Sequence, residues 1–148
     1  MKQETNEFNP PEQALALKEL GFDEPCLAHL IGFGDGTQDN GLYKIKQQQV
    51  FYPGDYASPD DKAEELGLHP FVMCGVPLYQ QAFRFFREKY GLEGVIQQAE
   101  DFKWYKWKIS QYNEDGKKYV ADWYEYKNYE EAELDCLKKL IEIVKDEK

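Results

Sequence analysis

The chain has 148 residues, of which 42% are hydrophobic and 16% aromatic, and its formal net charge is −10. The length is typical of one domain, and this content of bulky apolar side chains excludes an intrinsically disordered chain. The acidic balance disfavours general binding to nucleic acid or anionic lipid, because such a surface repels phosphate groups.

The first half of the chain predicts two helices and two strands. The first helix is expected to begin at Pro10, a proline at the first helical position, with Asn9 as its N-cap. It is expected to end at Gly21, which serves as a left-handed C-cap. Ser58 caps the second helix and Gly67 ends it. We expect a flexible tail at residues 1–8, followed by a helix at 10–20 and a strand at 26–31. A glycine-rich loop is expected at 32–41, a second strand at 43–51 and a short helix at 58–66.

The second half predicts a strongly amphipathic helix, a hairpin and a final helix. Residues 77–90 carry apolar side chains at helical spacing, at Tyr79, Ala82, Phe83, Phe86 and Tyr90. Residues 102–112 and 118–126 are rich in aromatic side chains and predict the two strands of the hairpin. Asn128 with an acidic first turn predicts the start of the final helix.

The expected turn of the hairpin is Asp115-Gly116, a dipeptide typical of type I′ turns. In the favoured register Trp107 lies opposite Tyr124, Tyr105 lies opposite Tyr126, and Lys106 lies opposite Glu125. The last pair joins opposite charges, which supports this register. We therefore predict an α+β fold over residues 1–148, as a single domain whose antiparallel sheet includes the hairpin and packs against three to four helices.

Three cysteines, an odd number and far apart, do not describe a disulfide framework. No stretch approaches the roughly 18 apolar residues of a membrane span. We therefore expect a cytoplasmic protein in a reducing compartment.

No motif assigns a catalytic residue or a cofactor. The glycine-rich segment 32–36 lacks the ending of a phosphate-binding P-loop, and no serine lies in a nucleophile turn. Acidic residues around the short helix, from Asp55 to Glu65, are typical of a solvated helix face. A structural zinc site has a weak candidate ligand set, which is Cys26, His29, His69 and Cys74. The setting of His29 and Cys74 is more typical of buried core residues than of zinc ligands.

The hairpin carries the most suggestive surface. If Trp107 and Ile109 face the core, the other face is expected to carry aromatic side chains interleaved with lysines, at Trp104, Lys106, Lys108, Tyr112, Tyr119 and Trp123. Such a face can bind a protein, or stack bases and hold phosphates. An ordinary cross-strand ladder, or a sheet covered on both faces, explains the same pattern.

Three stretches, residues 17–26, 77–91 and 129–141, resemble a group of small uncharacterised proteins encoded by phages and prophages of anaerobic gut bacteria. The resemblance covers about half the chain and implies a mobile-element context without an activity. The first hypothesis is therefore a non-enzymatic accessory protein that binds a host or phage protein. The alternatives are a binder of a small ligand or single-stranded nucleic acid, and an enzyme of unrecognised type with a site around His29 or His69.

Overall fold

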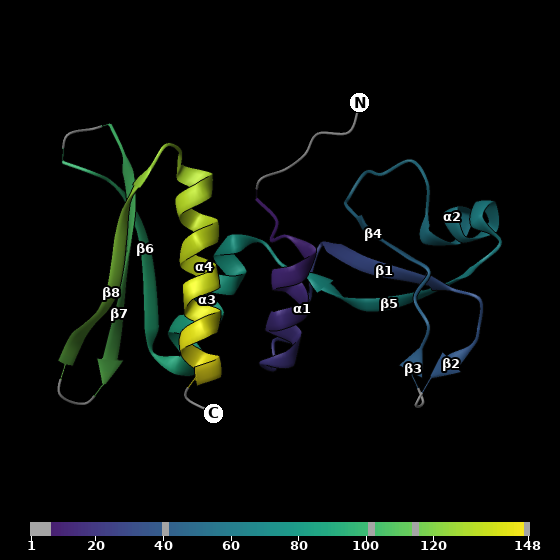
Figure 1. Cartoon of the computed structure of the whole chain (residues 1–148), viewed down its shortest axis with the longest axis horizontal. Coiled ribbons are helices and arrows are strands. Elements are labelled where there is room, and N and C mark those ends of the chain that lie inside the picture. The colour runs from purple at the N-terminus through teal and green to yellow at the C-terminus, as the bar shows by residue number, and fades with distance from the viewer. Residues whose placement is uncertain (1–6, 40–41, 101–102, 114–115, 147–148) are drawn as a thin grey trace. The chain divides into compact units, whose positions relative to one another are not determined.

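The computed structural model describes residues 7–39, 42–100, 103–113 and 116–146, and it confirms the α+β class, with four helices and antiparallel sheets (Figure 1). The chain divides into two compact units, Met1–Pro77 and Leu78–Lys148. We call them the amino-terminal and carboxy-terminal units and describe each by itself, and the single domain stays a prediction. No helix in the described ranges is both long and apolar enough to cross a bilayer.

The amino-terminal unit is built around the strand β1. Its elements are α1 (Pro11–Glu19), β1 (Ala28–Gly34), β2 (Gln38–Asp39), β3 (Leu42–Tyr43), β4 (Gln47–Phe51), α2 (Pro59–Leu66) and β5 (His69–Val76). One sheet has the order β4-β1-β5 with antiparallel pairing throughout, and β2 and β3 form a separate pair. Residues 1–6 of the expected tail lie outside the described ranges, whereas the ring of Phe8 packs edge-on against Tyr52 with centroids 5.2 Å apart.

Both faces of β1 are buried from Leu30 onward, whereas His29 is exposed and does not occupy the buried core position that the sequence suggested. Leu30 lies in one apolar cluster with Ala14 of α1. Ile31 and Phe33 lie in a second cluster with Ala63 of α2. Since successive side chains of a strand point to opposite faces, this burial explains why β1 is a continuous apolar run in the sequence.

The glycine-rich loop expected over residues 32–41 is wrong at its start, because residues 32–34 belong to β1. A Cβ added at Gly32 would lie 2.7 Å from Cζ of Phe71 on the neighbouring strand. Gly32 therefore makes room for a side chain of β5 and does not serve a turn. The strand expected over residues 43–51 is divided between β3 and β4, and β5 was not predicted.

The predicted ends of the second helix are confirmed. Ser58 Oγ accepts a 3.1 Å hydrogen bond from the backbone N–H of Asp61, and Gly67 ends the helix at φ 68°. The first helix differs by one residue at its start, since Pro10 is the N-cap and the neighbouring Asn9 is buried.

The carboxy-terminal unit is a three-stranded antiparallel sheet with two helices. Its elements are α3 (Tyr79–Tyr90), β6 (Leu92–Gln98), β7 (Tyr105–Asn113), β8 (Gly116–Tyr126) and α4 (Tyr129–Asp146). The strand order is β6-β7-β8. A Cβ added at Gly94 of β6 would meet Phe83 of α3 and Cys136 of α4, so both helices pack on the same face of the sheet (Figure 1).

The predicted helices α3 and α4 are confirmed, with differences among the buried residues of α3. Gly91 ends α3 at φ 67°, and Asn128 Oδ1 caps α4 by accepting a 2.8 Å hydrogen bond from the N–H of Glu131. Phe85 is buried in α3, whereas the expected core residues Phe83 and Tyr90 are only partly buried. The strand β6 was not predicted, because its sequence is short, polar and interrupted by Gly94.

The predicted hairpin is present, but its register is wrong over most of its length. Asp115 lies outside the described residues, while Gly116 belongs to β8 and pairs with Asn113. The pairing shifts by one residue near Val120 and again at Glu125, which has a φ of 84°. These two bulges place Trp107 opposite Trp123 and Lys106 opposite Tyr124, and only Tyr105 opposite Tyr126 is as predicted.

Candidate functional site

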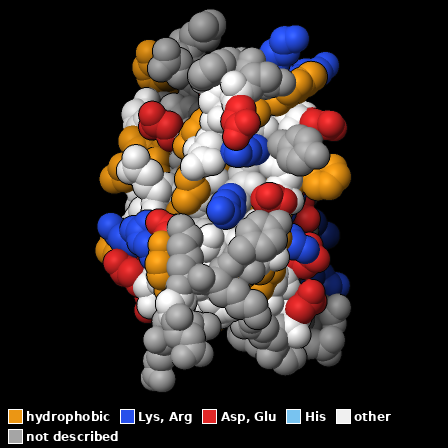
Figure 2. Space-filling view, turned by 90° about the vertical axis from the view of Figure 1, so that its left-hand side faces the viewer, with side chains coloured by type: hydrophobic (Ala, Val, Ile, Leu, Met, Phe, Trp, Pro, Cys, Tyr) orange, Lys and Arg blue, Asp and Glu red, His pale blue; other side chains and the backbone are white. Residues whose placement is uncertain are grey.

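The face of the carboxy-terminal sheet that points away from α3 and α4 is its outer face. Trp107 and Ile109 are buried on the helix-covered side of β7, so the alternating Lys106 and Lys108 lie on the outer face. Val95 of β6 pairs with Lys108 and also lies there, with 36% of its surface exposed. Figure 2 shows this side of the molecule, where side chains of both charges lie among hydrophobic ones.

The structure divides the six residues that the sequence proposed as one binding face. Lys106, Lys108 and Tyr112 share the outer face of β7 by strand alternation, and Tyr112 is exposed. Trp123 pairs with Trp107 and therefore lies on the helix-covered side, at the edge strand, with 58% exposure.

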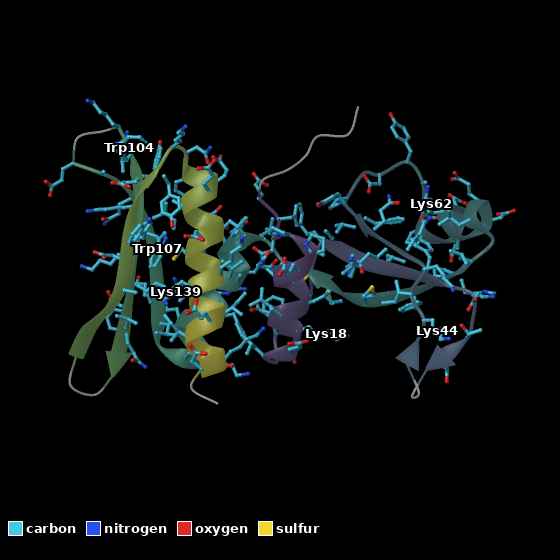
Figure 3. All side chains as sticks on the ribbon, viewed as in Figure 1. Lys18, Lys44, Lys62, Trp104, Trp107 and Lys139 are labelled. Carbon is cyan, nitrogen blue, oxygen red and sulfur yellow. The ribbon has the colours of Figure 1, made fainter. Side chains whose placement is uncertain are left out.

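The remaining two residues of that set are Trp104 and Tyr119. Trp104 precedes β7, is partly exposed, and accepts a 2.7 Å hydrogen bond at its carbonyl from Ala99 (Figure 3). The side chain of Tyr119 lies outside the described part of the structure. Lysines and both tryptophans are therefore not interleaved on a single face.

The candidate zinc ligands are not brought together. His69 lies opposite Gly34 at one end of β5, and Cys74 lies opposite Leu30 towards the other. They are five positions apart along the strand, a distance of about 17 Å. Among the described residues no group of three or more His, Cys, Asp or Glu side chains could hold a metal ion. Cys26 does lie near Cys74, and the pKa of the Cys26 thiol is raised by burial and by that neighbour.

A cavity of about 400 Å³ lies between α3, β6 and the start of α4. Eight residues line it: Gln80, Phe83, Arg84, Arg87, Gly94, Ile96, Tyr129 and Glu133. The four from α3 have the spacing of one helix face, and the two from β6 alternate on the helix-covered side of the sheet. The cavity and the outer face are therefore on opposite sides of the sheet, and neither histidine lines the cavity.

Gly94 sets how closely the two helices approach the cavity floor. A Cβ at this position would lie 2.9 Å from Sγ of Cys136 and 3.0 Å from Cε1 of Phe83. Those distances are shorter than ordinary van der Waals contact, so a side chain at this position would displace the side chains of Cys136 and Phe83 or the helices that carry them. The floor of the cavity thus depends on the absence of a side chain at Gly94.

Basic and acidic side chains line the same cavity. The pKa of Glu133 is raised to about 7 by burial and by the nearby Glu130, although a hydrogen bond from Tyr129 lowers it. The cavity wall therefore carries a carboxyl group whose pKa lies near neutral pH.

Sequence reasoning missed this cavity. It proposed no site at Arg84, Arg87 or Glu133. The available signal was the stripe of polar side chains Gln80, Arg84 and Arg87, which flanks Phe83 at helical spacing. Nothing in the sequence indicated which part of α4 or β6 would face that stripe.

No family model, curated protein or solved structure matches this chain. The geometry of the carboxy-terminal unit therefore carries the functional argument.

Proposed function

We propose that this chain is a non-enzymatic, cytoplasmic accessory protein of phage or prophage type, and that it binds a protein partner through the outer face of the β6-β7-β8 sheet. The resemblance of residues 17–26, 77–91 and 129–141 supports the phage context. Three free cysteines agree with a reducing compartment.

One observation carries the proposal: both helices of the carboxy-terminal unit cover the same face of its sheet. An antiparallel sheet can leave its other face to solvent, and that face then carries mainly polar side chains. Here the outer face also presents Val95 and Tyr112, which are large and exposed. Mixed aromatic, aliphatic and charged surfaces of this kind are typical of transient protein interfaces.

The charge arrangement favours a protein over a nucleic acid. Lys108 lies directly opposite Asp122 in the sheet, so an acidic residue accompanies one of the two central lysines. The correction of the register also removes Trp123 from the side of these lysines. A nucleic-acid surface would need aromatic and basic side chains on one face, without adjacent carboxylates.

The test is a quantitative pull-down from a lysate of an anaerobic gut bacterium that carries a related prophage. The bait proteins are the wild type, Val95→Arg on the outer face, and Val72→Arg as a matched control. Val72 is 65% exposed on β5 of the amino-terminal unit, so the control places the same charge on an exposed strand of the other unit.

We expect the wild-type and Val72→Arg baits to retain the same partner protein. The Val95→Arg bait should retain at least about tenfold less of it, which corresponds to a loss of roughly 1.4 kcal/mol in binding free energy. Equal retention by all three baits would contradict the proposed surface. Sedimentation of the three purified proteins distinguishes a second copy of this chain from a different partner, because self-association would then be lost only in Val95→Arg.

A further inference from the structure

We draw no further inference here: the strongest candidate, the cavity between α3, β6 and the start of α4, carries none because no contact among the described residues shows how the arginines of α3 lie relative to Glu133 of α4.

Discussion

The indole Nε1 of Trp107 donates a 2.8 Å hydrogen bond to the hydroxyl of Tyr126, which in turn donates to the carboxylate of Asp135. Trp107 is only 5% exposed, so its N–H has no access to bulk water. The hydrogen bond between Trp107 and Tyr126 thus joins β7 to the end of β8, and the bond from Tyr126 to Asp135 extends the connection to α4. The pKa of Tyr126 is raised to about 12, first by burial and then by Asp135.

Replacing this hydroxyl should destabilise the carboxy-terminal unit. Tyr126→Phe leaves the buried N–H of Trp107 without its acceptor, and we expect a loss of about 1 to 3 kcal/mol in the free energy of unfolding. The measurement is urea denaturation followed by tryptophan fluorescence, since all three tryptophans lie in this unit. Tyr56→Phe, at a fully exposed position, is the control and should change stability by less than about 0.5 kcal/mol. A Tyr126→Phe protein as stable as the control would contradict the role of this hydrogen bond.

A side chain at the cavity floor should also be destabilising. Gly94→Ala places a Cβ 2.9 Å from Sγ of Cys136, and the overpacking should cost about 1 to 3 kcal/mol. In a double-mutant cycle with Cys136→Ala, the double variant should be more stable than the two single effects predict, by about 0.5 kcal/mol or more. Strictly additive effects would show that Cys136 does not limit the space at Gly94.

Stability should depend on pH through Glu133. Its pKa of about 7 in the folded protein is above its ordinary value of 4.5, so the folded state holds this proton more tightly than the unfolded state does. The resulting stabilisation is complete below about pH 4.5 and is lost as the pH rises through about 7. Glu133→Gln should therefore flatten the fall in urea midpoint between about pH 5 and about pH 8.

Several charged and titratable groups surround Glu133. They are Tyr79, Arg84 and Arg87 of α3, and Tyr129, Glu130 and Cys136 of α4. Of these groups, Glu133 has a raised pKa of about 7, and it therefore titrates between about pH 5 and about pH 8. Glu88→Gln, at an exposed position of α3, is the control and should keep the wild-type pH profile. A Glu133→Gln profile that still follows wild type would assign the dependence elsewhere.

The three thiols should react with an alkylating reagent in a defined order. Cys26 is partly exposed, whereas Cys74 and Cys136 are buried. Burial raises the pKa of each thiol, and for Cys136 the neighbouring Asp135 and Glu133 raise it further. We expect alkylation of the native protein at Cys26 first and at Cys136 last, as measured by mass spectrometry over time. Rapid alkylation of Cys136 would mean that α4 opens far more readily than its packing implies.

The sequence by itself determined the elements whose ends depend on nearby residues. The cap at Ser58 and the helix stops at Gly67 and Gly91 each need only a few neighbouring residues, and all are present as predicted. The amphipathic stripe that begins at Tyr79 likewise follows from helical spacing alone.

Only the tertiary structure decided which strands pair, and where. The strands β5 and β6 have weak local signals and exist because β1 and β7 supply their hydrogen-bond partners. The bulges near Val120 and at Glu125 depend on pairing across the hairpin, and a shift of one residue transfers Trp123 to the other face. The cavity joins residues of α3 and β6, which are consecutive in the chain, to residues of α4, which follows the hairpin. Its composition is set by how α3 and α4 pack around Gly94, and such packing is a non-local property that no sequence window contains.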